Sequence, residues 1–143
     1  MGFNRFLWKV TDADRDTMRE RGEVRHFKSG DVIISQDDKI DELFVVKIGN
    51  LRVTRILQES MVVEFAGPLG PGDAIGEMSF VDGKGASATL VADGDVELLA
   101  IPKRVIEDLQ AADPTFSGRF YESLVLELAH KLRSTNQRIL PQA

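Results

Sequence analysis

The spacing of hydrophobic and polar residues changes twice along the chain, and the first segment has the signals of a short helix. Thr11 is a good N-cap, Asp14 follows three residues later as in a weak capping box, and Gly22 stands where a helix stop is expected. The sequence therefore predicts an N-terminal helix over residues 12–21.

Residues 23–101 have the pattern of short strands joined by turns. Apolar or alternating runs such as EVRHF, DVIISQ, ELFVVKI, LRVTRIL, MVVEFA, SATLVA and VELLAI are separated by glycine, proline, asparagine and aspartate. Gly49-Asn50 and Asp93-Gly94 each lie between two such runs and predict tight hairpins. About eight short strands at this spacing predict a mainly β fold, an eight-stranded β-roll built as a jelly-roll-like barrel.

Four glycines in this region have a structural explanation of their own, because turns and close backbone approach favour glycine. They are Gly30, Gly49, Gly72 and Gly76. Asp31 and Asp73 directly follow two of them, and we expect their carboxylates to accept hydrogen bonds from turn amides.

Residues 103–140 return to a helical period and predict two helices after the roll. The second is long: Asp113 is its expected N-cap, Pro114 suits its first position, and Pro141 ends it. The predicted architecture is an N-terminal helix, a β-roll and a long C-terminal helix.

The long helix carries two apolar stripes. One has the a/d spacing of a coiled-coil seam and consists of Tyr121, Val125, Leu128, Leu132, Thr135 and Ile139. The other consists of Phe116, Phe120 and Leu124. A helix with two apolar faces needs two partners, so we expect the roll to cover one face and a second copy of the chain to cover the other. The alternative is one broad stripe buried wholly within the monomer.

Composition narrows the function classes. A chain of 143 residues fits one domain, and the absence of cysteine excludes disulfides, thiol catalysis and zinc–thiolate sites. His26 and His130 lie far apart, and a net charge of −5 gives no general attraction to nucleic acid. No apolar run approaches the roughly 20 residues of a membrane span. We expect a cytoplasmic protein that is not an enzyme, with no cofactor, no metal, no membrane contact and no direct nucleic-acid contact.

Four landmarks stand in order: KSGDVIISQDDKIDELFVVKIGNLRV, then LGPGDAIGEMSF, then ASATLVADGDVELLAI, then the long helix. With these landmarks the chain resembles the cyclic nucleotide-binding domain family, as in the catabolite activators and the regulatory subunits of cyclic AMP-dependent protein kinase. The resemblance extends from about Phe3 to Leu140, so residues 1–143 form one domain on this interpretation. It implies a non-enzymatic regulatory sensor that binds cyclic AMP or cyclic GMP.

In the family, residues 76–89 correspond to the phosphate-binding cassette. The resemblance implies that a short helix begins near Gly76 and directs its amides at the cyclic phosphate. It also implies that Glu77, which is followed by Met78, accepts a hydrogen bond from the ribose 2′-hydroxyl.

The other end of the cassette departs from the family pattern, because the position of the phosphate-binding arginine falls on Ala86. Ser87 and Ala88 match the small residues beside the phosphate. Loss of one partner of a buried ion pair costs roughly 3–5 kcal/mol, which corresponds to roughly two to four powers of ten in affinity. Lys84 could partly compensate as a phosphate contact, although it lies between two glycines at an expected exposed tip.

Thr135 and Asn136 match polar residues late in the long helix that reach the purine in the catabolite activators, also from the partner subunit. Asn136 suits a purine edge because an amide both donates and accepts. The alternative is that Thr135 fixes the register of the helical seam and Asn136 is a surface residue. No helix-turn-helix follows before Ala143, so output is expected through an unidentified downstream protein.

Three hypotheses remain open from the sequence. The chain is a cyclic-nucleotide sensor that tolerates loss of the arginine, or a dimeric module that senses a different small ligand, or a protein-interaction module whose pocket is empty or filled by its own side chains.

Overall fold

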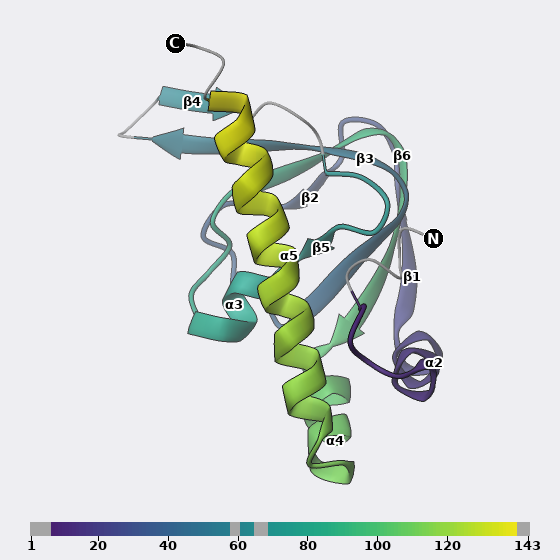
Figure 1. Ribbon diagram of the computed structural model, residues 1–143. Coiled ribbons are helices and arrows are strands. Elements are labelled where there is room, and N and C mark those ends of the chain that lie inside the picture. Colours follow the sequence, from purple (N-terminus) through teal and green to yellow (C-terminus); the bar gives the residue numbers. More distant parts are fainter. Residues whose placement is uncertain (1–6, 58–60, 65–68, 140–143) are drawn as a thin grey trace.

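The computed structural model describes residues 7–57, 61–64 and 69–139, and the side chains of all of these except 135–139. Within this part of the chain, six strands form one antiparallel sheet with four helices around it (Figure 1). The elements are α2 (Asp12–Arg21), β1 (Glu23–Phe27), β2 (Val32–Ile34), β3 (Glu42–Leu57), β4 (Met61–Glu64), β5 (Ala74–Ile75), α3 (Glu77–Asp82), β6 (Thr89–Pro102), α4 (Lys103–Ala112) and α5 (Phe116–Ile139).

The prediction of a mainly β fold with a helix at each end is confirmed. The strands follow the order β1-β6-β3-β4, while β2 pairs with β6 and β5 pairs with β3. Among the described residues the strands number six rather than eight, and they do not close into a barrel.

Both predicted tight hairpins are wrong, and this accounts for two of the missing strands. Gly49-Asn50 lies inside β3 and Asp93-Gly94 lies inside β6, and these two long strands pair with each other past both sites. Irregularities in the register flank Gly49, whose φ is 93°. A Cβ at Gly49 would lie 2.2 Å from the carbonyl oxygen of Asp95. The glycine therefore permits a bulge against the partner strand and not a chain reversal.

The start of α2 follows the sequence prediction. The amide of Asp14 donates to Oγ1 of Thr11 at 3.1 Å, and the amide of Thr11 donates to Oδ2 of Asp14 at 3.0 Å. The two bonds complete a capping box. Gly22 ends the helix in an extended conformation, where a Cβ would lie 2.6 Å from the carbonyl oxygen of Met18.

The positive φ favoured by glycine is present at all four predicted glycines, but at Gly49 it lies in a bulge of β3 and not in a turn. Gly30, Gly49, Gly72 and Gly76 have φ values of 91°, 93°, 92° and 90°. Asp31 Oδ2 accepts from the amide of Lys28 at 2.8 Å, and Asp73 Oδ2 accepts from the amide of Gly70 at 2.7 Å.

The long helix begins two residues later than Pro114. Asp113 closes α4 through its amide, which donates to the Leu109 carbonyl at 3.1 Å. Its carboxylate accepts from the amide of Thr115 at 2.9 Å, and α5 starts at Phe116. Asp113 thus holds the turn between the two helices, and Pro114 lies in that turn.

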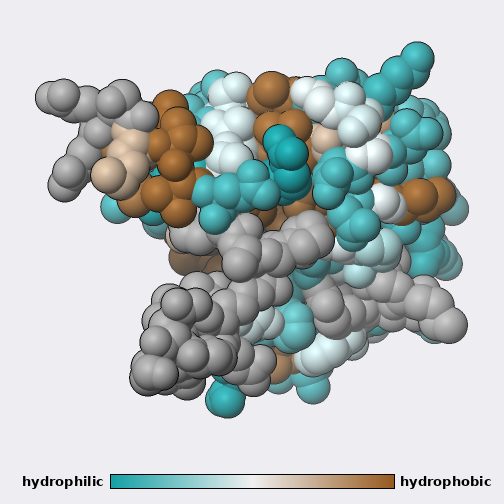
Figure 2. All heavy atoms as spheres, turned by 90° about the horizontal axis from the view of Figure 1, so that it is seen from above, coloured by the Kyte–Doolittle hydropathy of each residue, from teal (hydrophilic) through white to brown (hydrophobic). Residues whose placement is uncertain are grey.

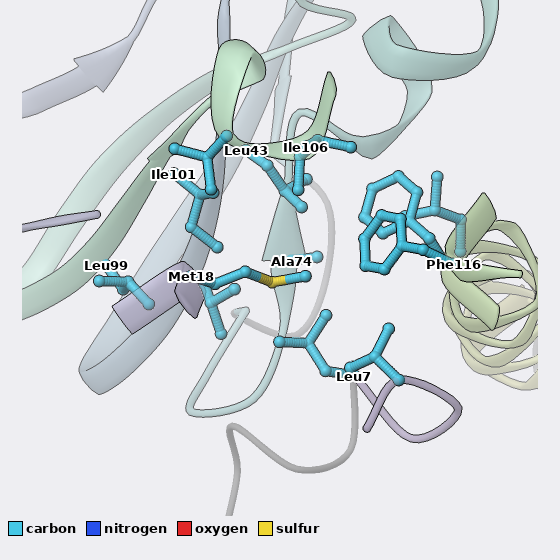
Figure 3. Packing of buried hydrophobic residues seen from close by; sticks show 13 residues of the cluster. Leu7, Met18, Leu43, Ala74, Leu99, Ile101, Ile106 and Phe116 are labelled. Carbon is cyan, nitrogen blue, oxygen red and sulfur yellow. The ribbon is translucent and has the colours of Figure 1, made fainter. Parts of the chain in front are cut away.

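The core lies between α5 and the sheet, with α2 and α4 closing it at one end (Figure 1). Figure 3 shows Leu7, Met18, Ile101 and Phe116 converging from the N-terminal segment, α2, β6 and α5. A second buried cluster lies on the other face of the sheet and includes Ala86.

The two stripes of α5 have different environments. Phe116, Phe120 and Leu124 are buried, with exposed fractions of 0 %, 0 % and 1 %. On the seam, Tyr121, Val125 and Leu132 are 42 %, 63 % and 63 % exposed. The alternative of one broad stripe buried within the monomer is therefore wrong for the described residues.

Candidate functional site: residues 76–89 and their contact with α5

The loop over residues 76–89 is shaped by two glycines that bracket α3. Gly76 precedes the helix with φ 90° and Gly83 follows it with φ 72°, both in the left-handed region. A Cβ at Gly76 would lie 3.0 Å from the carbonyl oxygen of Glu42. The backbone therefore turns from β5 into α3 at a position that strongly favours glycine.

Glu77 is the first residue of α3 and is buried, with 4 % of its surface exposed. Its Oε1 lies 2.9 Å from Nζ of Lys131 on α5. Its Oε2 is buried and has no hydrogen-bond partner within the described part of the chain. One carboxylate oxygen is thus paired with a cation, and the other is buried without a donor among the described residues.

The same face of α5 also holds the strand that leads into the loop. Oε2 of Glu127 accepts from the amide of Ala74 at 3.0 Å, and Nζ of Lys131 donates to the carbonyl of Ala74 at 2.6 Å. Glu127 and Lys131 are four residues apart and therefore lie on one side of the helix. Together with Glu77 they place two carboxylates and one ammonium at the junction of β5, α3 and α5.

The far end of the loop has no such charge. Ala86 is 8 % exposed and belongs to the apolar cluster on the other face of the sheet. Its amide donates to the Asp38 carbonyl at 2.8 Å, and its carbonyl accepts from the amide of Asp37 at 2.8 Å. A Cβ at Gly85 would lie 2.6 Å from the Asp37 carbonyl, so glycine allows this close approach.

The remaining predicted residues of the loop are exposed or half-buried. Met78 is 46 % exposed, Ser87 is exposed and Ala88 is half-buried. Lys84 is exposed, and its amide donates to Oδ1 of Asp82 at 2.9 Å.

Thr135 and Asn136 belong to α5, but their side chains lie outside the described residues. Their expected contact with a purine therefore stays a prediction.

Sequence reasoning missed Glu127 and Lys131. The signal was present, because the two polar residues continue the buried stripe of α5 at helical spacing. The complete stripe is Phe116, Phe120, Leu124, Glu127 and Lys131. A glutamate and a lysine in line with a buried stripe indicate a polar contact between the helix and the element beneath it.

Two further properties concern the described residues as a whole. No helix among them is both long enough and apolar enough to cross a membrane. Nor do they contain a group of three or more histidine, cysteine, aspartate or glutamate side chains placed to hold a metal ion.

Comparison with protein families gives a match to the cyclic nucleotide-binding domain over residues 24–113. The match covers more than half of the chain. It includes most of the sheet, the loop over residues 76–89 and α4.

Individual relatives agree with this match. A lysophospholipase NTE1 of Candida albicans is 32 % identical over 117 residues, which is 78 % of this chain and 8 % of that protein. A cAMP-dependent protein kinase regulatory subunit of Mycosarcoma maydis is 28 % identical over 86 residues, 60 % of this chain and 16 % of that protein. Among solved structures, the catabolite activator protein of Thermus thermophilus has a TM-score of 0.75 at 26 % identity, over 94 % of this chain and 61 % of that one. The chain therefore spans a small part of the two curated relatives.

Proposed function

The chain belongs to the cyclic nucleotide-binding domain family, and from this premise we propose that it is a non-enzymatic regulatory module that binds cyclic AMP or cyclic GMP weakly at residues 76–89. The observation that carries the proposal is the asymmetry of this loop. Glu77 is buried and charge-paired with one oxygen free, whereas the position expected to hold the phosphate carries Ala86.

The expected weakness follows from the hydrogen bonds that remain for the phosphate. Neutral amides and the Ser87 hydroxyl contribute about 0.5–1.5 kcal/mol each, against roughly 1.5–3 kcal/mol for a bond to a charged donor. Lys84 could supply a charge, but it lies at the exposed tip of the loop, where an ion pair contributes little. We expect dissociation constants in the sub-millimolar to millimolar range, two to four powers of ten above roughly micromolar.

A calorimetric titration with cyclic AMP and cyclic GMP tests this proposal on the unmodified protein and on two variants. Ala86→Arg restores a guanidinium, and we expect at least about tenfold tighter binding. Ala86→Gln is the matched control, because it adds a long polar side chain without charge and should give little gain. A long side chain can lead its head group out of the apolar cluster in which the Ala86 methyl lies.

Micromolar binding by the unmodified protein would contradict the idea that Ala86 weakens the site. Equal affinity of the arginine variant and the parent would show that something other than the missing charge limits binding.

A second part of the proposal is a homodimer through the seam of α5. It is supported by the exposure of Tyr121, Val125 and Leu132 on a helix whose opposite stripe is buried. We expect the double variant Leu128→Glu, Leu132→Glu to remain folded and to sediment as a monomer, while the parent sediments as a dimer at high micromolar concentration.

The control for this experiment comes from another exposed apolar patch. Ile56 and Leu57 at the end of β3 and Met61 and Val62 at the start of β4 are all exposed. Figure 2 shows hydrophobic side chains gathered at that side of the molecule. Val62→Glu adds a charge there but leaves the seam intact. We therefore expect this variant to sediment as a dimer, like the parent. A parent protein that is monomeric at high concentration would remove the dimer from the proposal.

The proposal includes a cytoplasmic location and an unidentified downstream protein as the receiver of the signal. It does not include the activity named for the lysophospholipase relative, because the match covers 8 % of that protein. The alternative is an interaction module with an empty pocket or a different small ligand. That alternative would be favoured if the titrations detected no binding of either cyclic nucleotide and the chain still formed a dimer that depended on the seam.

A further inference from the structure

The strand β4 forms one edge of the sheet. It pairs with β3 on one side, and no described strand lies along its other side (Figure 1). Met61 and Val62 are 60 % and 64 % exposed, and Glu64 is exposed as well. The strand contains neither proline nor lysine, the residues that commonly protect such an edge. The edge is therefore open to pairing with another strand.

A side-chain contact on the other side of β3 shows which backbone groups face this open edge. The amide of Ile56 donates to Oε1 of Gln36 at 2.7 Å, and its carbonyl accepts from Nε2 of Gln36 at 3.3 Å. The Gln36 amide in turn donates to Oγ1 of Thr89 on β6, so Gln36 lies on the β6 side of β3. Both backbone groups of Ile56 therefore point away from β4. Since Ile56 is paired with Val62, the N–H and C=O of Val62 point away from β3, towards the open edge.

We propose that the open edge of β4 pairs with the same strand of a second copy of this chain, antiparallel and centred on Val62. In this register Val62 faces its own counterpart, and the two residues exchange both of their backbone hydrogen bonds. Met61 of each copy faces Val63 of the other. The contact is separate from the α5 seam and does not depend on the binding of a cyclic nucleotide.

The side chains favour this register and a second copy as the partner. Ile56 and Val62 lie opposite each other and share one face, so the pairing joins two apolar pairs into a single row. A register shifted by two residues would instead place Val62 against Glu64. In the proposed register the two Glu64 carboxylates lie at opposite ends of the contact, and each is 3.9 Å from Nε of Arg52 in its own chain. Because the same residues supply both sides about a two-fold axis, a second copy matches this edge.

The contact is short, and this sets its strength and its consequence. β4 has four residues, and two such strands bury less surface than a stable dimer requires. We therefore expect the pairing to be too weak to be detected by sedimentation at micromolar concentration. A dimer formed through α5 carries two such edges, so pairing at β4 would join these dimers into larger assemblies.

The absence of cysteine lets single-cysteine variants report this contact. Facing residues of a hydrogen-bonded pair have Cα atoms about 5.5 Å apart, which is within the range of a disulfide. Under oxidation with copper phenanthroline, Val62→Cys should form linked dimers about tenfold faster than Val32→Cys, or more. Val32 is the matched control, because it is a valine on β2 that is 56 % exposed. The difference should persist when Leu128→Glu and Leu132→Glu are added to remove the α5 seam.

A mixture of Met61→Cys and Val63→Cys tests the register, because these two residues face each other and not themselves. We expect mixed disulfides to exceed those between identical chains by about threefold or more. Val62→Pro, added to both chains, should remove this excess. Proline lacks the outward N–H but is tolerated on an edge strand where that N–H faces solvent.

Cross-linking of Val62→Cys no faster than that of Val32→Cys would overturn the inference. So would random linking of Met61→Cys and Val63→Cys, which indicates undirected apolar contact, or a link that disappears with the α5 seam. An excess that survives Val62→Pro in a folded protein would exclude the backbone of β4 and overturn it as well. Should Val62→Pro not fold, Val62→Glu replaces it, since it sets two carboxylates against each other at the centre of the pair. The proposed function stands or falls separately from these results.

Discussion

The two stripes of α5 both begin with aromatic and aliphatic side chains, but one stripe is buried and the other is exposed to solvent. Phe120 and Leu124 are buried against the sheet, whereas the adjacent Tyr121 and Val125 are 42 % and 63 % exposed. Towards the end of the helix the buried stripe becomes polar and contacts the loop through Lys131, while the exposed stripe remains apolar with Leu132.

This difference separates two tasks of one helix. The buried stripe packs within the monomer and reaches the candidate site, and the exposed stripe is the surface on which the proposed dimer depends. Substitutions on the buried stripe should therefore change the stability of the single chain, and substitutions on the exposed stripe should leave it nearly unchanged.

The largest effect is expected from Phe120→Ala. Phe120 is fully buried, stacks on Phe116 with ring centroids 5.5 Å apart, and meets Phe80 edge-on at 6.0 Å. We expect the free energy of unfolding to fall by about 3–5 kcal/mol, measured by urea denaturation at a protein concentration low enough to favour monomers.

Val125→Ala is the matched control on the exposed stripe. Its side chain is 63 % exposed, so the change in unfolding free energy should stay within about 0.5 kcal/mol. Similar losses in the two variants would mean that the stripes do not differ in the way described above.

A smaller effect is expected where the buried stripe meets the loop. Glu77→Gln keeps the size of the side chain but leaves the ammonium of Lys131 with a neutral acceptor, and should lower the free energy of unfolding by about 1–3 kcal/mol. The same variant should weaken any cyclic nucleotide whose 2′-hydroxyl binds there. Urea denaturation measures the first effect and calorimetry the second.

Glu122→Gln provides the control, because Glu122 also pairs with a lysine, but at 3.8 Å and with a side chain that is 59 % exposed. An exposed pair contributes roughly 0–1 kcal/mol, so this substitution should have almost no effect. If the free energy of unfolding fell equally in the two variants, burial of the Glu77–Lys131 pair could not explain the stability that this pair contributes.

The parts of the fold that the sequence predicted depend on local chemistry. Thr11 and Asp14 form a capping box from two residues three positions apart, and Gly76 takes the positive φ expected at the entry of the loop. Such features need no knowledge of distant segments. Gly49-Asn50 was misassigned because a bulge and a tight hairpin use the same residue types, and only the pairing of β3 with β6 distinguishes them.

The candidate site shows the same limit. The sequence singles out Glu77 and Ala86 because the family pattern is local there, and their roles towards a ligand stay predictions. The partner of Glu77 could not be predicted, because Lys131 is 54 residues away and the contact depends on how α5 crosses the sheet. A polar pair that continues a buried stripe predicts which face of the helix makes polar contacts, but it does not predict which residue of the sheet or loop is the partner.

The smallest effect concerns the start of α5 and depends on pH. The Arg119 guanidinium hydrogen-bonds the Asp113 carboxylate at 2.9 Å and, together with the hydroxyl and amide of Thr115, lowers the pKa of Asp113 from 3.8 to about 2. Because the folded carboxyl has the lower pKa, the unfolded chain binds more protons between these values. The contribution to stability is therefore present above about pH 5 and is lost as the pH falls through 3.8 towards about 2.

Asp113→Asn removes the charge of this side chain, but the asparagine can still accept a hydrogen bond from Thr115. The difference in urea midpoint between parent and variant should therefore be small at neutral pH and should shrink towards zero on acidification. A difference that stayed constant from neutral pH to about pH 2 would show that the charge of Asp113 does not contribute to the stability of the folded chain.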